Sequence, residues 1–218
     1  KVYCDGMQTT HSSPDGWGED SVVTMAKHWP GGGTGEGGRD AHYPFGKYAV
    51  YPGNNFKEHL KPFLEGAFSL DGETKKCAAI MPYYNIPWNI DEKYDENVGN
   101  SYSKYIIKDL LIDKYGYEGV VCTDWSITQD MTPFIGAYMP GGKCHGVEEL
   151  TMPERFLKLV MNGVNQIAGV DEIKVLLEAY HIGCQSYGNE IMDELVRKSA
   201  YKLLLNIFRL DLFENPYL

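Results

Sequence analysis

The chain has 218 residues, 43% of them hydrophobic, so it can form one domain with a core and is too apolar to be disordered over most of its length. Its 30 acidic residues outnumber its 20 basic ones and give a net charge of -10, which disfavours binding to nucleic acid or to an anionic membrane, because phosphate groups would be repelled. An unbroken apolar stretch of about 18 residues is absent, so no membrane span is expected.

Apolar, β-rich runs alternate with helical patterns along the chain. The expected strands lie near residues 22–29, 77–84, 119–124 and 164–168. The expected helices cover residues 54–69, 101–115, 152–162, 171–182 and 188–209. A glycine-rich loop over residues 30–48 follows the first strand. Continuous apolar strands that alternate with helices predict an α/β fold with a parallel sheet.

Cysteine and glycine spacing excludes several kinds of site. The five cysteines are widely scattered without a CxxC pair, so no zinc site and no other cofactor is expected. The glycines at 31–38 lack the GK[ST] of a phosphate-binding loop. The G-x-G-x-x-G at 33–38 does not lead directly into a helix, because the next expected helix begins only at residue 54, and this disfavours a doubly wound nucleotide-binding domain.

Polar and aromatic residues stand at the ends of three expected strands. These are Lys27-His28-Trp29, Tyr83-Tyr84-Asn85 and Asp124-Trp125. The carboxyl ends of parallel strands meet at one edge of the sheet, where ligands bind in α/β folds. The sequence therefore predicts a site at this edge. The aromatic content of 13% fits a protein that stacks rings on a sugar, and it equally fits a tyrosine-rich core.

The number of strands is too small for a closed barrel. A (β/α)8 barrel needs eight strands and roughly 250 residues. The four expected strands would leave two unpaired sheet edges. The chain is therefore either a small doubly wound sheet or half of something larger.

Five segments, in order, resemble glycoside hydrolase family 3, the family of many β-glucosidases and β-xylosidases. They are "AKHWPGGG" (26–33), "GGRDAHYPFGKY" (37–48), "IMPYYN" (80–85), "GYEGVVCTDW" (116–125) and "FRLDLFENPY" (208–217), the last with Asp211 where the family usually has Gly. Any one of these segments is weak evidence, but five at suitable spacing are a specific match over nearly the whole chain.

The resemblance implies a partial (β/α)8 TIM barrel of about four β/α units. Residues 1–218 would be the C-terminal half of the family's N-terminal barrel. Residues 209–218 would begin the linker to a second domain. The remaining barrel half and the second domain would be partners, in the same chain or in another one.

The resemblance also assigns roles to the strand-end residues. Asp124 matches the family's nucleophile, although an aspartate there could also cap a helix. Lys27 and His28 match a pair that hydrogen-bonds sugar hydroxyls, often across a non-proline cis peptide bond. Tyr84 matches a tyrosine that steadies the nucleophile, with Tyr83 as the alternative by one position.

Trp125 would present its ring to the sugar, or it packs at the barrel mouth. The acid/base is the open part of the site. In two-domain relatives it is a glutamate on the second domain, which this chain lacks. In the single-domain β-N-acetylhexosaminidases it is a histidine in a D-S-H loop, and Asp40-Ala41-His42 stands in a similar place. His42 is thus a candidate acid/base, while a structural or subsite role for Arg39, Asp40 and His42 is the favoured alternative.

The function expected from these features is that of a retaining exo-acting β-glycosidase, specifically a β-glucosidase, whose substrate is an oligosaccharide or β-glycoside. Two alternatives remain open. The chain could be an inactive carbohydrate-binding or scaffold fragment, or a β-N-acetylhexosaminidase-like enzyme that uses His42.

Overall fold

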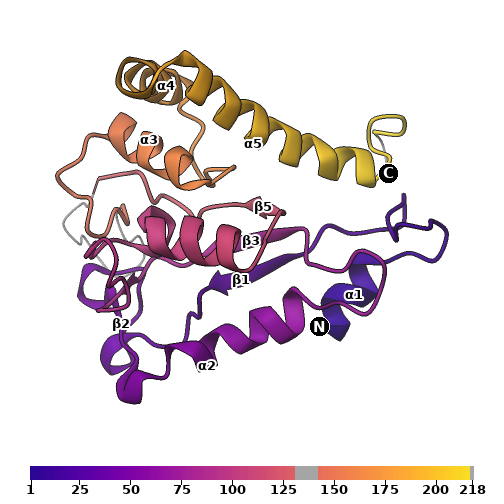
Figure 1. Cartoon of the computed structure of the whole chain (residues 1–218), viewed down its shortest axis with the longest axis horizontal. Coiled ribbons are helices and arrows are strands. Elements are labelled where there is room, and N and C mark those ends of the chain that lie inside the picture. Colours follow the sequence, from indigo (N-terminus) through magenta and orange to yellow (C-terminus); the bar gives the residue numbers. More distant parts are fainter. Residues whose placement is uncertain (131–141, 217–218) are drawn as a thin grey trace.

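The computed structural model describes residues 1–130 and 142–216. Its centre is a three-stranded parallel sheet with the order β1-β3-β5 (Figure 1). The strands are β1 (Met25–Trp29), β2 (Tyr48–Ala49), β3 (Ala79–Pro82), β4 (Ile86–Pro87) and β5 (Val120–Val121). The α-helices are α1 (Val2–Gln8), α2 (Phe56–Lys61), α3 (Met152–Asn162), α4 (Ile173–Tyr187) and α5 (Asn189–Arg209). The predicted α/β class with a parallel sheet is confirmed.

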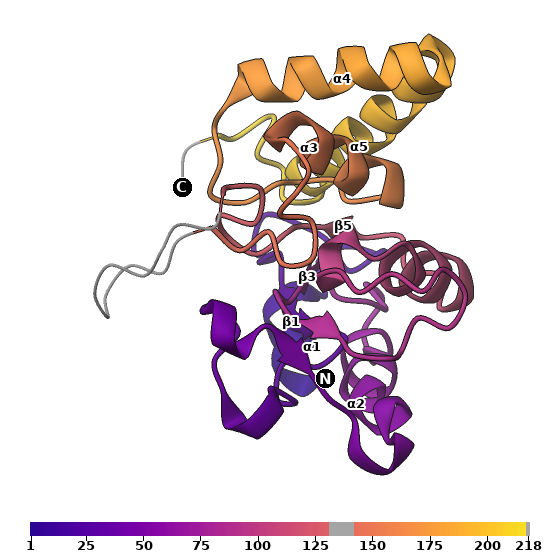
Figure 2. The same ribbon diagram turned by 90° about the vertical axis from the view of Figure 1, so that its left-hand side faces the viewer.

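Helices flank the sheet on both sides of its strand order. In Figures 1 and 2, α1 and α2 lie beyond β1, whereas α3, α4 and α5 gather beyond β5. The strands pair in register, with Met25 opposite Ala79 and Ala79 opposite Val120. All four residues of β3 are buried, as expected for a strand covered on both faces.

The strand expected at 164–168 is reduced to a single parallel bridge between Cys122 and Gln166. The reason is the side chain of Asn165. The backbone N–H of Val121 donates to Asn165 Oδ1 at 3.0 Å, where a neighbouring strand would offer a carbonyl. Of the four expected strands, the one at 164–168 is therefore not formed. The segment still lies next to the end of β5, at the edge of the sheet.

The two faces of the sheet belong to different parts of the core. Ile80 and Val121 pack in the main cluster, together with Trp29 of β1. The opposite face carries a smaller cluster, completed by Leu203 of α5; its members on the sheet are Ala79, Met81, Val120 and Cys122. This alternation follows from the two-residue period of a strand. None of the five cysteines forms a disulfide, and Cys77, Cys122 and Cys144 are buried.

Two expected helices differ in type from a simple α-helix. The segment 54–69 is α2 followed by a π-helical segment, Pro62–Ala67, and the change occurs where Pro62 has no N–H to donate. The segment 101–115 contains a 3₁₀ turn, Asn100–Tyr102, and a π-helix, Tyr105–Lys114.

The helix α3 has the predicted bounds of 152–162. A capping box between Thr151 and Glu154 begins it, and Gly163 ends it with a φ of 97°. The sequence signals for α3 are strong because the cap, the proline in the first turn and the terminal glycine all agree.

The short strands β2 and β4 were not predicted. They pair in parallel, with Tyr48 opposite Ile86, and attach the glycine-rich loop to the segment that follows β3. Two-residue strands leave no periodic pattern in a sequence. The helix α1 was also missed.

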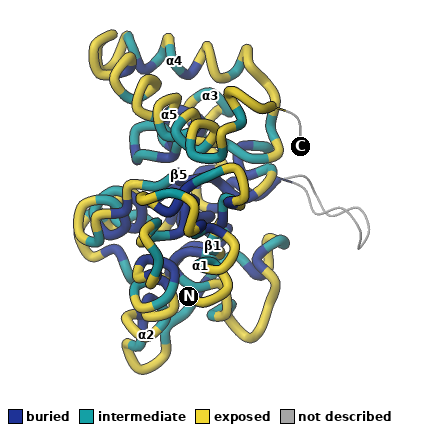
Figure 3. The backbone as a smooth tube through the Cα atoms, turned by 90° about the vertical axis from the view of Figure 1, so that its right-hand side faces the viewer, coloured by how far each residue is buried: buried dark blue, intermediate teal, exposed yellow. Residues whose placement is uncertain are grey.

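Much of α4 and α5 is exposed, in contrast to the central strands (Figure 3). The exposed apolar side chains include Ile173, Leu177, Tyr201 and Phe208. Of the expected linker 209–218, residues 217 and 218 lie outside the described residues. Within the described residues, none of the helices has the length and apolar character needed to cross a membrane.

Candidate active site

Three strand ends bring the candidate residues together at the carboxyl edge of the sheet. His28 lies in β1, Tyr84 follows β3 by two residues, and Asp124 follows β5 by three. Parallel pairing places these positions side by side, as the sequence predicts. The peptide bond between Lys27 and His28 is cis, as the family resemblance implies.

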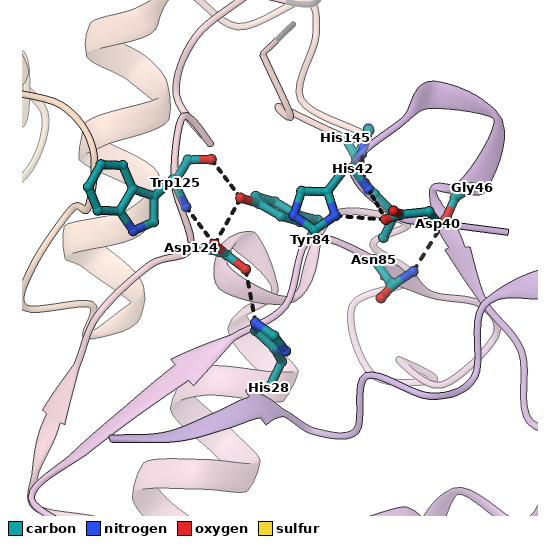
Figure 4. Close-up of polar contacts among 10 residues, drawn as sticks. His28, Asp40, His42, Gly46, Tyr84, Asn85, Asp124, Trp125 and His145 are labelled. Carbon is teal, nitrogen blue, oxygen red and sulfur yellow. Dashed lines mark hydrogen bonds and ion pairs between the residues drawn. The ribbon is translucent and has the colours of Figure 1, made fainter. Parts of the chain in front are cut away.

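Asp124 is the centre of this cluster (Figure 4). Its Oδ1 accepts hydrogen bonds from the Tyr84 hydroxyl at 2.8 Å and from the Trp125 backbone N–H at 2.8 Å. His28 Nε2 lies 3.3 Å from the other oxygen, Oδ2. That approach is not aligned as a hydrogen bond, so the buried Oδ2 has no hydrogen-bond partner among the described residues.

These contacts keep Asp124 ionised. Burial alone would raise the pKa of the carboxyl, because it removes the charge from water. The contact with His28 and the hydrogen bonds from Trp125 and Tyr84 outweigh burial, and they hold the pKa below its usual value of 3.8. Asp124 is therefore a carboxylate at neutral pH.

Tyr84, and not Tyr83, is the tyrosine that contacts the carboxylate. Burial and the hydrogen bond to Asp124 raise the pKa of Tyr84, so its hydroxyl keeps the proton that it donates. The same hydroxyl lies 3.0 Å from the Trp125 carbonyl oxygen. Tyr83 instead packs its ring against His28, with centroids 4.4 Å apart.

Trp125 has two parts with different surroundings. Its backbone is tied to Asp124 and Tyr84, whereas 62% of the residue is exposed. Gly169, with a φ of 68°, packs against the ring, and a Cβ at this position would lie 2.6 Å from Trp125 Cε3. Glycine is needed at this point to let the ring pack so closely.

Asp40 and His42 form a pair beside this cluster. Asp40 Oδ1 lies 2.7 Å from His42 Nδ1 and accepts the His42 backbone N–H at 2.9 Å. The His42 ring meets the Tyr84 ring edge to face, with centroids 4.9 Å apart. Asp40 and His42 are thus connected to Asp124 indirectly, because the His42 ring packs against Tyr84, which donates to Asp124.

Lys27 and Arg39 do not join the cluster. Lys27 is exposed, and Arg39 Nη1 lies 3.4 Å from Glu36 Oε2. Within residues 1–130 and 142–216, no hydrogen bond or ion pair connects either side chain to Asp124. Their expected contacts with a substrate stay predictions.

Sequence reasoning missed two buried residues near the site. The Lys143 ammonium lies 5.5 Å from the centre of the Tyr84 ring, and its pKa is lowered by burial. His145 Nε2 lies 3.1 Å from the Ala41 carbonyl oxygen. Both are in the segment between β5 and α3. Its place after the Asp124 strand was a usable signal, since such loops line the ligand edge.

A separate cavity of about 760 Å³ opens at the opposite end of the sheet. Residues that precede β3 and β5 line it, together with Lys202 and Arg209 of α5. Asp124 is not among its lining residues. We place the candidate site at Asp124, because ligands of parallel sheets bind at the carboxyl edge. No group of three or more His, Cys, Asp or Glu side chains in the described parts of the chain could hold a metal ion.

Comparisons with known proteins show the family of the chain. Residues 1–138 match the model of the glycosyl hydrolase family 3 N-terminal domain. A probable β-glucosidase C from Aspergillus flavus is 38% identical over 203 residues, which are 93% of this chain and 29% of the relative. A periplasmic β-glucosidase/β-xylosidase from Dickeya chrysanthemi is 35% identical over 224 residues, 99% of this chain and 32% of the relative. The chain thus spans about a third or less of the length of these relatives.

Solved structures are similar in fold at lower identity. A family 3 β-N-acetylglucosaminidase from Paenibacillus has a TM-score of 0.60 at 20% identity, over 87% of this chain and 31% of that one. A β-N-acetylhexosaminidase from Beutenbergia cavernae has a TM-score of 0.58 at 18% identity, over 86% of this chain and 47% of that one. The family model covers more than half of the chain, and the chain belongs to glycosyl hydrolase family 3.

Proposed function

We propose that the chain carries the nucleophile of a retaining exo-acting β-glycosidase, specifically a β-glucosidase, and that the nucleophile is Asp124. The observation that carries the proposal is the asymmetry of this carboxylate. Two donors hold Oδ1, while the buried Oδ2 accepts no hydrogen bond among the described residues and lies 3.3 Å from His28 Nε2. A carboxylate that is fixed through one oxygen presents the other to an electrophile.

The proposed reaction has two displacements. Asp124 Oδ2 attacks the anomeric carbon while the bond to the aglycone oxygen breaks, and an acid gives that oxygen a proton. The product is a glycosyl ester of Asp124. Water then attacks the anomeric carbon, loses a proton to the same group, and releases Asp124 as a carboxylate with the sugar configuration retained.

The residues around Asp124 suit a terminal sugar. We assign His28 and Lys27 to sugar hydroxyls, and the exposed Trp125 ring to the apolar face of a sugar ring. We assign Arg39 and Asp40, which are exposed in the loop that carries His42, to further contacts with the substrate. Relatives described as β-glucosidases support glucose as the sugar.

His42 is the candidate proton donor that we identify in this chain. His42 is paired with Asp40 at 2.7 Å, which orients the imidazole, and its ring touches Tyr84. This geometry favours a second candidate function, that of a β-N-acetylhexosaminidase-like enzyme with His42 as acid/base. In the first candidate, a glutamate outside this chain supplies the proton, and Asp40 and His42 form a subsite.

A partner surface fits the first candidate. Ile173, Leu177, Tyr201 and Phe208 are each more than half exposed on α4 and α5. Apolar patches of this kind mark interaction sites. We propose that a further barrel half and a second domain cover them, since the relatives are about three times as long as this chain.

The test is covalent trapping of Asp124. The complete protein encoded by the gene is exposed to a 2-deoxy-2-fluoro glucoside with a dinitrophenyl leaving group, which needs little proton donation. We expect intact mass to rise by one sugar and peptide mapping to place that sugar on Asp124. Asp124→Asn is the matched control, because it keeps the shape of the side chain and loses the charge. A protein that remains unlabelled under these conditions would favour the inactive carbohydrate-binding alternative.

A second assay separates the two candidate enzymes. Aryl β-glucoside, β-xyloside and β-N-acetylglucosaminide are compared in the wild type and in His42→Gln. A β-glucosidase with an external acid should prefer the glucoside, and any loss of rate in His42→Gln should be the same for the dinitrophenyl and the methylphenyl aglycone. A preference for the N-acetylglucosaminide, with a loss in His42→Gln confined to the poorer leaving group, would support His42 as the acid/base.

A further inference from the structure

His145 connects three segments behind the candidate site. The residue is fully buried, in the segment between β5 and α3. Its Nε2 lies 3.1 Å from the Ala41 carbonyl oxygen, and its own carbonyl accepts the Gly99 N–H at 2.9 Å. The proposed reaction gives this buried imidazole no chemical task.

The turn that carries Asp40 and His42 is held at both of its ends. His145 contacts Ala41 at one end, and Asn85 Nδ2 donates to the Gly46 carbonyl at 3.3 Å at the other. The turn closes tightly on itself, since a Cβ on Gly46 would lie 2.0 Å from the Asp40 carbonyl oxygen. Figure 4 shows His145 and Asn85 next to this turn, close to Asp40.

This turn reaches the nucleophile through one continuous set of contacts. The His42 ring, next to Ala41 in the chain, packs 4.9 Å from the Tyr84 ring. Tyr84 in turn donates to Asp124 at 2.8 Å. A displacement of Ala41 therefore moves the ring that supports the hydrogen-bond donor of Asp124.

The protonation state of His145 follows from its neighbours. Nε2 faces a carbonyl oxygen, so it carries the proton. Nδ1 is buried without a partner among the described residues, so a second proton there would be an uncompensated charge. Burial lowers the pKa of His145, Lys47 and Lys143 lower it further, and Glu148 and the contact with Ala41 oppose them. The ring is neutral at pH 7.

We propose that His145 is a positioning residue, which fixes the Asp40–His42 turn against Tyr84 through its hydrogen bond to the Ala41 carbonyl. This role rests on the proposed function of Asp124. His145 was not among the site residues expected from the sequence. His145 touches neither the substrate nor the carboxylate, and it acts through Ala41, His42 and Tyr84.

The test uses two polar replacements of different length. His145→Gln keeps an N–H donor that can reach the Ala41 carbonyl, whereas His145→Asn is too short. His181→Asn, on the exposed side of α4, is the matched control. The first readout is the NMR cross-peak between the His42 and Tyr84 rings, and the second is the rate at which the fluoroglucoside labels Asp124, both measured on the complete protein.

We expect His145→Asn to lose the cross-peak and to label roughly tenfold more slowly, because small misplacements near a reacting group are costly. His145→Gln and His181→Asn should keep both. A cross-peak that persists in His145→Asn, or a Gln variant as defective as the Asn variant, would overturn the proposal. Should the Asn variant not fold, His145→Met, which fills similar space without an N–H donor, takes its place. It should lose the cross-peak and label more slowly, and a Met variant that keeps both would overturn the proposal.

The two proposals fail separately. If the wild type shows the cross-peak and the Asn variant loses it, but no protein is labelled, then His145 positions the turn and the assignment of Asp124 as nucleophile fails. If the wild type is labelled and His145→Asn matches it in both readouts, then Asp124 stands and the role of His145 fails.

Discussion

Replacing Tyr84 by Phe removes one hydroxyl from the candidate site and leaves the ring in place. The lost contact is the 2.8 Å hydrogen bond to Asp124 Oδ1. A hydrogen bond to a charged group contributes about 1.5–3 kcal/mol. At about 1.36 kcal/mol per pKa unit, the carboxyl of Asp124 should then titrate roughly 1–2 units higher. We expect the acid limb of Asp124 labelling by the fluoroglucoside to move up by that amount.

Tyr83→Phe is the matched control for this experiment. It makes the same chemical change one residue away, at a ring that packs on His28 instead of donating to Asp124. Its acid limb should remain at the wild-type position. An unchanged acid limb in Tyr84→Phe, or an equal shift in both variants, would refute the view that the Tyr84 hydroxyl stabilises the charged nucleophile. Thermal unfolding of both variants shows whether either change has altered the fold.

Three further outcomes are expected. Trp125→Ala should raise KM for aryl glucosides by roughly three- to tenfold with little change in kcat, since an aromatic contact contributes about 0.5–1.5 kcal/mol; a fall in kcat alone would contradict ring stacking. Arg155→Met should lower the free energy of unfolding by about 3 kcal/mol in urea, because the buried guanidinium donates to the carbonyls of Thr128, Val147 and Glu148; a change below about 1 kcal/mol would contradict this. Because the folded pKa of Asp124 is lowered, its contribution to stability is present above the unfolded value of 3.8 and is lost as pH falls through the folded pKa. The stability difference between the wild type and Asp124→Asn should therefore shrink in acid, and a constant difference from pH 7 to pH 3 would refute this.

The sequence predicted the parallel sheet and the helices with strong end signals. The helix α3 matches its predicted bounds, because the Thr151 cap and Gly163 both mark it. The strand near 164–168 was wrong, because its apolar character does not show that the Asn165 side chain replaces a backbone partner. A run of apolar residues indicates that a segment is buried. It does not distinguish a strand from an extended segment that pairs with the sheet at a single residue.

The candidate site was predicted in its strand-end members and not in its supporting ones. His28, Tyr84 and Asp124 meet because parallel strands end at one edge, which a sequence can reveal. Lys143 and His145 are brought to the site by a long segment after β5, and their positions depend on tertiary contacts with Tyr84 and Ala41. These two contacts join residues 59 and 104 positions apart in the chain, and contacts at such separations have no local signal.

The two oxygens of Asp124 have different surroundings, and the difference suits the proposed reaction. Each hydrogen bond to a carboxylate favours its charged form and at the same time makes its lone pairs less available. Both aligned donors are on Oδ1, and the His28 ring 3.3 Å from Oδ2 also helps to keep Asp124 ionised, while Oδ2 accepts no hydrogen bond among the described residues. The Trp125 N–H is held in place by the end of β5, and the Tyr84 ring is supported by His42. The two hydrogen bonds to Oδ1 therefore depend on the backbone of β5 and on the Asp40–His42 turn. A nucleophile of this kind needs support on its bonded side, and His145 and Asn85 contribute to it by holding the turn that packs against Tyr84.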